Sequence, residues 1–186
     1  MQYVNKYKFF FDIFLSLNLF IFFLPILIFI SFFLLIFYGY PIFFVQNRIG
    51  ANNQLFKIYK FRTLTVNTKN IETNKIKKFN YVVLGKFMRK YKIDEFPQLI
   101  NVLKGDMSLV GPRPALYNQY NLKKKRTKKK IHLLKPGITG YAQIMATNLM
   151  SDSEKITLDF IYCKNVSLVF DLKIIFLTVK FLFKKF

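Results

Sequence analysis

The strongest pattern in this chain is an uncharged, largely apolar stretch from residue 13 to residue 45, rich in Phe, Leu and Ile. A straight helix of that length would be roughly 50 Å long, whereas the hydrocarbon core of a bilayer is roughly 30 Å thick. Pro25 lies within the stretch and removes a helical hydrogen bond, so we predict that the helix kinks or ends there. The two resulting arms, 13–24 and 26–37, would each be about one leaflet deep.

Basic residues flank this stretch on both sides, namely Lys6 and Lys8 before it and Arg48, Lys57, Lys60 and Arg62 after it. A helix that spans a membrane normally has more Lys and Arg on its cytoplasmic side. The similar charge at both ends therefore suggests a re-entrant hairpin with both ends in the cytoplasm. An ordinary tilted, kinked transmembrane helix is the alternative, and composition alone favours it because spanning helices tolerate proline.

After Val45, polar and apolar residues mix, and the pattern predicts a second region with several short elements. Partial alternation in 56–64 predicts a strand, and 84–91 has the character of a short helix. Residues 65–80 are polar and are predicted to form a surface loop. Further along, we predict a basic run at 123–130 on or beside a helix, a Gly- and Pro-containing loop at 135–143 and a helix at 153–162.

Residues 94–104 are the best helix candidate in this second region. Asp94 is a favoured N-cap type, Pro97 falls in the first turn, and Gly105 lies where a left-handed residue would end the helix. The following GPRP (111–114) is predicted to be an extended turn, because two prolines and a glycine exclude regular structure.

The C-terminal segment 167–186 is mainly apolar, and its lysines at 173, 180 and 184 form a narrow stripe along a helix. This pattern favours a helix that lies in the membrane interface, with the lysines reaching toward the headgroups. A helix packed on the core of the protein is the alternative. We therefore predict an α+β, mostly helical fold, with an anchor at 1–45 and a catalytic domain at 46–186 that includes this interfacial helix.

Composition narrows the class of protein. The chain has 186 residues, 53% of them hydrophobic, and a formal net charge of +21. Such a combination favours a protein on the anionic cytoplasmic leaflet of a membrane, and nucleic acid is the other usual partner of so much positive charge. The single cysteine, Cys163, excludes an internal disulfide. With one histidine, His132, the chain offers no zinc cluster, so a divalent cation would need oxygen ligands, as Mg²⁺ does.

The adjacent acids Asp94 and Glu95 are the main candidates for chemistry, since the chain has only nine acidic residues against thirty basic ones. At a helix N-cap the carboxylate of Asp94 would be stabilised in its ionised form by free N–H groups. It could then cap the helix, bind a metal or attack phosphorus. Simple capping is the commonest role of such a residue, and Glu95 could likewise be only a first-turn acid.

Arginines before and after this acidic pair provide a second indication of chemistry, because they could bind phosphate. Arg89 lies five residues upstream, and Arg113 lies between Pro112 and Pro114 in the predicted turn. The planar guanidinium suits phosphate oxygens, and Lys60 and Arg62 would add further positive charge. A lone arginine is usually only solvated, but the two prolines make Arg113 an exception. These residues are the candidate phosphate-binding set.

At this point the chain resembles a known family, the bacterial sugar transferases, also called monotopic phosphoglycosyl transferases. The resemblance covers nearly the whole chain and rests on KFRT (60–63), R-x4-DE-x-PQ-x3-V-x-KGDMSLVGPRP (89–114), KPGITG-x-AQ (135–143), LD-x2-Y (158–162) and DLKI (171–174). Asp12 and QNRIG (46–50) are similar to the family as well. The length resembles the small members that lack an additional multi-span domain.

The resemblance implies a re-entrant helix broken at Pro25 and a catalytic domain on the cytoplasmic face of the bacterial inner membrane. It also implies a two-step reaction. Asp94 would attack the sugar-bearing phosphorus of a UDP-sugar and release UMP, and the phosphosugar would then pass to polyprenol (undecaprenyl) phosphate. Mg²⁺ would bind near Asp94, Glu95 would assist by positioning the metal or handling a proton, and Arg89 and Arg113 would hold phosphate or nucleotide.

The chain departs from the family pattern at a few positions. Leu24 precedes Pro25 where the family usually has Ser, so one local hydrogen-bonding group is absent. The alternatives to the enzyme are a basic nucleic-acid-binding protein, suggested by 123–130, and a non-catalytic membrane protein. No short motif encodes the sugar or the pathway, and the oligomeric state is left open, with a homodimer among the alternatives.

Overall fold

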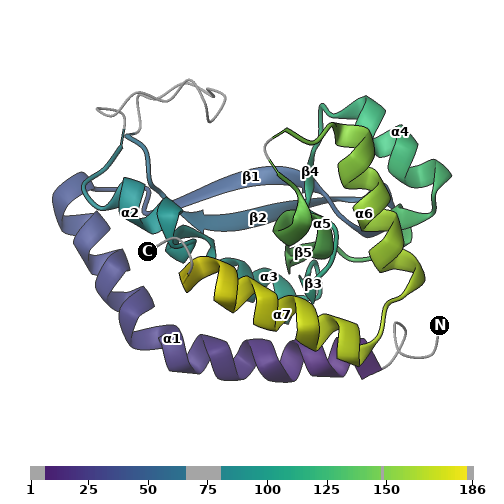
Figure 1. The fold of residues 1–186 in the computed structure, drawn as a ribbon. Coiled ribbons are helices and arrows are strands. Elements are labelled where there is room, and N and C mark those ends of the chain that lie inside the picture. The colour runs from purple at the N-terminus through teal and green to yellow at the C-terminus, as the bar shows by residue number, and fades with distance from the viewer. Residues whose placement is uncertain (1–6, 66–80, 148, 184–186) are drawn as a thin grey trace.

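The computed structural model describes residues 7–65, 81–147 and 149–183, so the predicted loop at 65–80 lies almost entirely outside the described residues. The fold is α+β and mostly helical, as predicted (Figure 1). In chain order its elements are α1 (Lys8–Tyr38), β1 (Phe43–Ile49), η2 (Ala51–Asn53), β2 (Leu55–Phe61), α2 (Gly85–Lys90), η5 (Ile93–Glu95), α3 (Gln98–Leu103), β3 (Ser108–Val110), β4 (Ala115–Leu116), α4 (Tyr120–Lys128), η6 (Ile131–Leu133), β5 (Gly137–Thr139), α5 (Tyr141–Met145), α6 (Asp152–Lys164) and α7 (Leu168–Phe183).

The N-terminal helix α1 is continuous over 31 residues and contains Pro25. Figure 1 shows that it changes direction part-way along its length, running beneath the domain and then up one side. Proline is the usual cause of such a bend, because its ring collides with the preceding turn. The two predicted arms are therefore limbs of one bent helix, and the helix does not end at Pro25.

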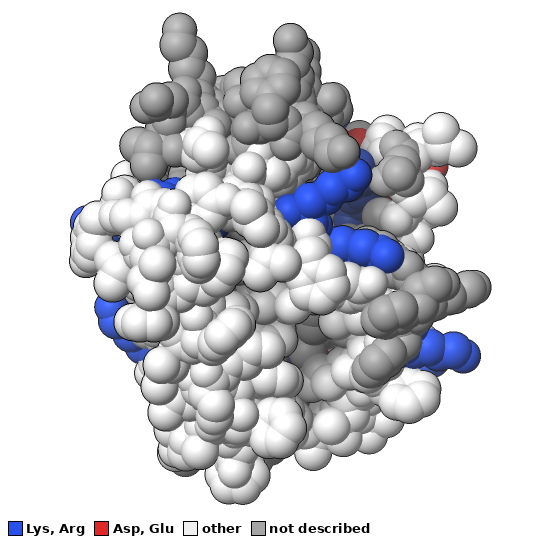
Figure 2. Space-filling view, turned by 90° about the vertical axis from the view of Figure 1, so that its left-hand side faces the viewer, with Lys and Arg blue, Asp and Glu red and all other residues white. Residues whose placement is uncertain are grey.

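By length and composition alone, α1 could cross a membrane, and 17% of the residues in its most apolar 18-residue window are buried within the molecule. The core helix of a soluble protein would be mostly buried. Figure 2 shows the face formed by the upper limb of α1 as a broad field of uncharged side chains, with Lys and Arg at its margins. A large apolar surface of α1 is therefore open to a hydrophobic environment.

The larger sheet has the order β2-β1-β4 and is antiparallel. β1 and β2 form a hairpin in which Phe43 pairs with Phe61, and the connection contains Asn52 and Asn53 at positive φ, which asparagine tolerates. β2 confirms the strand predicted at 56–64. β1 was not predicted, and it begins inside the range 1–45 that was assigned to the anchor.

The smaller sheet pairs β3 with β5 in parallel, with Ser108 opposite Gly137 and Val110 opposite Thr139. The prediction of a loop at 135–143 was therefore wrong in part, since this segment contains β5 and the start of α5. A strand of three residues is too short for alternation to reveal it. The helices predicted at 84–91 and 153–162 are confirmed as α2 and α6.

The predicted helix 94–104 is divided into the 3₁₀ turn η5 and the helix α3, and Asp94 makes no capping hydrogen bond. The N-cap prediction for Asp94 was wrong for a physical reason. A capping side chain bonds the N–H two or three positions ahead, and the third position here is Pro97, which has no N–H. Gly105 has the predicted left-handed conformation, with φ +82°.

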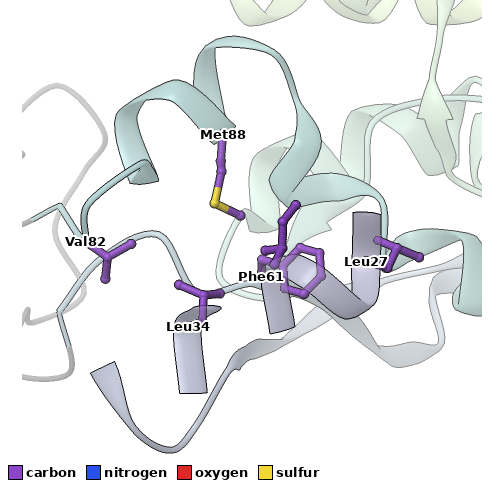
Figure 3. Close-up of a cluster of buried hydrophobic side chains, with 6 residues drawn as sticks. Leu27, Leu34, Phe61, Val82 and Met88 are labelled. Carbon is purple, nitrogen blue, oxygen red and sulfur yellow. The ribbon is translucent and has the colours of Figure 1, made fainter. Parts of the chain in front are cut away.

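Two apolar clusters join α1 to the domain. The first brings Leu27 and Leu34 of α1 against Phe61, Val82 and Met88, as Figure 3 shows. The second lies between α3, β3, α6 and α7, and the first limb of α1 packs against it. Because both limbs of α1 contribute to a core, the bend in α1 follows the shape of the domain.

The C-terminal helix α7 has two different faces. Asp171 and Ile174 are fully buried, whereas Val169 and Phe176 are 77% and 69% exposed. The alternative prediction, that this helix packs on the core of the protein, is therefore correct for one face. The other face is apolar and exposed, as an interfacial helix requires. The position of α7 in a membrane interface stays a prediction.

Candidate active site

The adjacent acids Asp94 and Glu95 both lie in the 3₁₀ turn η5 and are both buried. The preceding residue, Lys92, has a left-handed backbone with φ +61°, and the chain therefore turns sharply into η5. Two neighbouring carboxyl groups are thus held close together inside the protein, where their charges are costly unless cations compensate them.

Glu95 has the cations that its burial requires. Its Oε1 accepts a hydrogen bond from Lys60 Nζ at 2.7 Å and lies 3.8 Å from Lys92 Nζ. Burial alone would raise the pKa of Glu95, but the charges of Lys60, Lys92 and Arg113 outweigh it and lower the pKa to about 2. The carboxylate of Glu95 is therefore expected to stay ionised, with basic side chains around it.

Asp94 is in a different state, although it is the next residue. Within the described part of the chain, its Oδ1 is buried and has no hydrogen-bond partner. Burial, followed by the charge of Glu95, raises the pKa of Asp94 to about 6, against the opposing effects of Lys60, Lys92 and Arg89. The expectation that a helix cap stabilises its ionised form was therefore wrong. A buried carboxylate oxygen without a partner is unusual and is a common feature of functional sites.

Lys60 is positioned by an interaction that the sequence did not reveal. Asn101 of α3 is fully buried, and its Nδ2 donates to the Lys57 carbonyl at 2.7 Å while its Oδ1 accepts from the Tyr59 N–H at 3.1 Å. This pair of bonds fastens the edge of β2 to α3, so the strand that carries Lys60 is fixed beside the turn that carries Glu95. A polar Asn within the apolar LINVL of α3 was the available signal.

Arg89 and Arg62, both predicted to bind phosphate, have different surroundings. Arg89 of α2 donates from Nε to Thr63 Oγ1 at 2.8 Å and is close enough to Asp94 to act on its pKa. Arg62 is buried, and its Nη2 donates to the carbonyls of Tyr38 and Gly39 at 2.7 and 3.1 Å. The structure therefore places Arg62 at the C-terminal end of α1, where it satisfies carbonyl groups that the helix leaves unpaired.

The GPRP turn presents Arg113 to solvent between two buried prolines. Three hydrogen bonds hold the backbone of this turn. The carbonyl of Pro112 accepts from the Gly137 N–H at 3.0 Å. The carbonyl of Arg113 accepts from the Arg126 side chain at 2.8 Å, and that of Pro114 accepts from the Arg48 side chain at 3.2 Å. The rigid turn that the sequence predicted is therefore also bonded at each of its last three residues. The Arg113 side chain remains available for a ligand.

Arg126 and Asp159 form a further ion pair that the sequence reasoning missed, with Nη2 and Oδ2 2.6 Å apart. Because Arg126 also bonds the carbonyl of Arg113, this pair links α6 and α4 to the GPRP turn. Asp159 belongs to the LD-x2-Y motif, and its contact with Arg126 gives that acid a positioning role. Arg48 of β1 was also missed, and burial followed by the charge of Arg113 lowers its pKa to about 10.

Two glycines allow the motifs KGDMSLVGPRP and KPGITG to cross closely. A Cβ at Gly111 would overlap the carbonyl oxygen of Lys135, and a Cβ at Gly137 would overlap the backbone nitrogen of Gly111. At Gly50, by contrast, a Cβ would meet a side-chain atom of Phe56 at 3.0 Å. Backbone atoms cannot move aside as a side chain can.

We therefore expect Gly111→Ala to destabilise the protein by about 3 kcal/mol or more, because β3 and β5 must separate to admit the methyl group. Gly50→Ala is the matched control and should cost about 1 kcal/mol. Urea unfolding of the detergent-solubilised variants measures both values. Equal losses at Gly111 and Gly50 would contradict this account of the crossing.

A cavity of about 770 Å³ opens beside these residues. Its charged part is lined by five basic and three acidic residues: Arg48, Lys92, Arg113, Arg126 and Lys155 with Glu95, Asp152 and Asp159. Its walls continue along α1 and α7, where the lining side chains are apolar except for Thr178. This volume lies within the range of roughly 300–1,000 Å³ that is typical of ligand sites.

A divalent cation was expected near Asp94. Within the ranges that the structure describes, no group of three His, Cys, Asp or Glu side chains comes together. The unpartnered Oδ1 of Asp94 nevertheless fits a hard cation. Mg²⁺ often takes one or two carboxylates and completes its shell with water and substrate phosphates. The acidic pair Asp94 and Glu95 is compatible with that kind of binding.

Comparison with known proteins decides the family. The sequence profile described as "Bacterial sugar transferase" matches residues 3–185. The chain belongs to the bacterial sugar transferase family. The resemblance seen in the motifs is thereby confirmed.

Among its relatives is the "Uncharacterized sugar transferase EpsL" of Bacillus subtilis, which is 44% identical over 76% of this chain and 70% of its own length. Two others are 40% identical over 75% of this chain. One is the UDP-N-acetylgalactosamine-undecaprenyl-phosphate N-acetylgalactosaminephosphotransferase of Aeromonas hydrophila. The other is the UDP-glucose:undecaprenyl-phosphate glucose-1-phosphate transferase of Klebsiella pneumoniae. The matches span 35% and 32% of those two proteins.

Proposed function

We propose that this sugar transferase moves a sugar 1-phosphate from a UDP-sugar to polyprenol phosphate, giving polyprenyl-diphosphate sugar and UMP. The observation that carries the proposal is Asp94, a buried carboxyl group with an unpartnered oxygen among Lys60, Lys92 and Arg89. The names of the Aeromonas and Klebsiella relatives contain one acceptor and two different sugars. They support undecaprenyl phosphate as the acceptor and leave the sugar undetermined.

In the first step an oxygen of ionised Asp94 attacks the sugar-bearing phosphorus of the donor. A bond forms between this oxygen and phosphorus, the bond from phosphorus to the bridging oxygen breaks, and UMP leaves with the electron pair. In the second step a phosphate oxygen of the polyprenol phosphate attacks the same phosphorus. The bond to Asp94 then breaks, and the carboxylate is regenerated.

The surrounding cations make this attack feasible. An anionic carboxylate that approaches a diphosphate meets like charge, and electrostatic stabilisation provides most of the catalysis in phosphoryl transfer. We propose that Arg113, with its side chain exposed beside the cavity, and Arg89 hold phosphate groups, together with Lys60 through its position at Glu95. Pro112 and Pro114 contribute by keeping the backbone of Arg113 rigid.

We propose that Mg²⁺ is held at the carboxylate of Asp94, with Glu95 beside it. When bound, the ion supplies positive charge that neutralises the diphosphate of the donor. Glu95 itself stays ionised, because Lys60 and Lys92 face it, and so it orients these cations and adds negative charge for the metal. The chain's own contribution is to keep both carboxyl groups buried and fixed.

We further propose that α1 is a re-entrant membrane helix and that the domain lies on the cytoplasmic face of the inner membrane, against anionic lipids. The bend in α1, its exposed apolar surface and the apolar outer face of α7 support this arrangement. Cysteines introduced one at a time at Tyr7 and Gly39, after replacement of Cys163, test it by labelling in intact cells. A cysteine at either end that an impermeant periplasmic reagent modifies would exclude the hairpin.

The function is tested by UMP release from membrane fractions supplied with polyprenol phosphate and a panel of UDP-sugars, with and without EDTA. We expect UMP release with at least one donor and its loss on chelation. The same preparations should retain little nucleic acid at physiological salt, which distinguishes the enzyme from the basic nucleic-acid-binding alternative. Failure of every donor in the presence of acceptor and Mg²⁺ would contradict the proposal.

The raised pKa of Asp94 predicts a particular pH dependence. Only the ionised carboxylate attacks, so the rate of the first step should fall as the pH drops through about 6. Below that value the ionised fraction decreases about tenfold for each pH unit. A burst of UMP, measured without acceptor from about pH 5 to about pH 8, gives the profile. An unchanged rate at the acid end would show that Asp94 is not the titrating nucleophile.

A further inference from the structure

The large cavity beside Glu95 has two ends of opposite character. The charged residues lie at one end, where five basic side chains outnumber three acids: Arg48, Lys92, Arg113, Arg126 and Lys155 with Glu95, Asp152 and Asp159. At the other end its walls are Leu15, Leu19 and Phe23 from α1, and Ile175, Val179 and Leu182 from α7. We infer that the isoprenoid chain of the lipid acceptor lies between α1 and α7, with its phosphate at the cationic end. This inference rests on the proposed function and adds the path of the lipid chain.

The charged end suits a phosphate group. Arg126 is paired with Asp159 and Lys92 with Glu95, but Arg113 is exposed and Arg48 lies close enough to Arg113 for each charge to destabilise the other. Two arginines that repel one another gain from an anion placed between or beside them. Burial is the main cause of the lowered pKa of Arg48, and the charge of Arg113 is the second. The geometric link is the bond from Arg48 to the Pro114 carbonyl, which places Arg48 beside the turn that carries Arg113.

The apolar end suits a hydrocarbon chain and no part of a nucleotide sugar. Uridine and sugar groups carry hydroxyl and amide groups that lose hydrogen bonds with water when they enter an apolar wall. Leu15 and Leu19 on α1 and Ile175 on α7 pack against the same apolar cluster. The cavity as a whole therefore matches an amphiphile with an anionic head.

The apolar end is also continuous with surfaces that fit a membrane. On α1 the neighbouring residues Leu17 and Phe22 are 46% and 75% exposed, and on α7 Phe176 is 69% exposed. Figure 1 shows α7 lying along the first limb of α1. A long chain that leaves the cavity between these helices therefore continues among lipid tails without crossing water, while its phosphate stays near Glu95.

A second hollow offers an alternative path and has a different chemistry. It measures about 400 Å³ and lies against the bend of α1, with Leu24, Ile28 and Phe43 in its lining. No Lys, Arg, Asp or Glu is among the described residues that line it. It could hold hydrocarbon, but it provides no cation for a phosphate. We therefore assign the acceptor to the first cavity.

Obstructing the apolar end tests the inference. Val179→Trp and Leu19→Trp place a large ring where the chain would pass, and overpacking of this kind costs enough to lower transfer to polyprenyl phosphate by roughly tenfold or more. The first step, measured as the burst of UMP without acceptor, should change by less than about twofold, because the donor does not use this end. Loss of the second step alone is the expected result.

Three matched variants serve as controls. Val169→Trp on α7 and Leu17→Trp on α1 make the same substitutions on outward faces, and Ile28→Trp obstructs the second hollow. Each should keep both steps near wild-type rates. If Ile28→Trp blocked transfer while Val179→Trp and Leu19→Trp did not, the chain would lie in the second hollow and the inference would be overturned.

A measurement on the unaltered protein keeps the test valid if a tryptophan variant fails to fold. Polyprenyl phosphate with a photoreactive group in its first isoprene unit can be cross-linked in membranes, and the adducts located by mass spectrometry. We expect adducts within 15–23 and 175–182, and adducts confined to 28–43 would overturn the inference. If the unaltered protein released no UMP with any donor, the proposed function itself would fail, which is a distinguishable result.

Discussion

Replacing Asp94 with Asn is expected to reduce UMP release by on the order of 10³-fold or more, because an amide cannot form the acyl phosphate intermediate. The folded protein should be as stable as the original or slightly more stable. Burial and the neighbouring Glu95 raise the pKa of Asp94, which means that the protein disfavours its charged form. Measurements of the UMP burst and of thermal unfolding on the same preparation separate chemistry from folding.

Asp106→Asn is the matched control for Asp94→Asn. Asp106 lies in the turn that follows α3, and its Oδ2 accepts from the Asn101 side chain at 3.4 Å, a long bond. The control should keep most of the UMP release and all of the membrane association. Turnover of Asp94→Asn at the wild-type rate, or a covalent phosphosugar on any other residue, would refute the assignment of the nucleophile.

The largest expected loss of stability follows from Asp171→Ala. Lys8 at the start of α1 donates from Nζ to Asp171 Oδ2 at 2.6 Å, and Tyr162 donates from its hydroxyl to Oδ1 at 2.6 Å. Asp171 is fully buried, and Lys8 is 7% exposed. Removing the carboxylate leaves the buried ammonium with Asp12, at 3.7 Å, as its ion-pair partner. We expect a loss of about 3–5 kcal/mol in the free energy of unfolding.

A double variant shows whether that loss comes from the unpaired charge. Lys8→Met with Asp171→Leu removes both charges and keeps the volume, so it should be more stable than Asp171→Ala alone. Urea unfolding in detergent gives each free energy. A loss below about 1 kcal/mol for Asp171→Ala would mean that water reaches Lys8 and that the pair contributes little to holding α1.

The long elements could be predicted from sequence because each has a strong local signal. The uncharged stretch predicted α1, and the capping box formed by Ser151 and Glu154 marks the start of α6 within one residue of where the pattern placed it. β1 and β5 were missed for different reasons. β1 follows the apolar stretch without a break in composition, and β5 has only three residues. β5 also depends on β3, a partner that is distant in sequence.

The site was predicted where its chemistry is local and missed where tertiary contacts decide it. Asp94 and Glu95 are adjacent in sequence, so their proximity required no fold. The assignment of Arg62 to phosphate binding rested on its charge, whereas its guanidinium bonds the last carbonyls of α1. Arg48 and Arg126 reach the cavity from β1 and α4. Arg48 lies in QNRIG and Arg126 in the basic run 123–130, but neither segment indicates by itself that its arginine meets the site.

The protonation state of Asp94 also depends on tertiary contacts that the local sequence does not reveal. A position before a helix suggested a stabilised carboxylate, but Pro97 removes the N–H that would have bonded it. Whether the ionised form of the Asp94 carboxyl group is stabilised then depends on burial and on the distances to Glu95, Lys60 and Lys92. Those distances are set by the attachment of β2 to α3 through Asn101, a contact across about forty residues that no local pattern encodes.

The ion pair between Lys8 and Asp171 has a consequence for biogenesis. Its two members are separated by 163 positions in the chain. At roughly 5–20 residues per second, a ribosome needs roughly ten to thirty seconds after Lys8 to synthesise Asp171. During that interval Asp12, on α1 itself, is the acid available to Lys8 from this ion-pair network, because Asp171 has not yet been made. The membrane anchor that we propose would therefore form before α7 can hold its first turn in place.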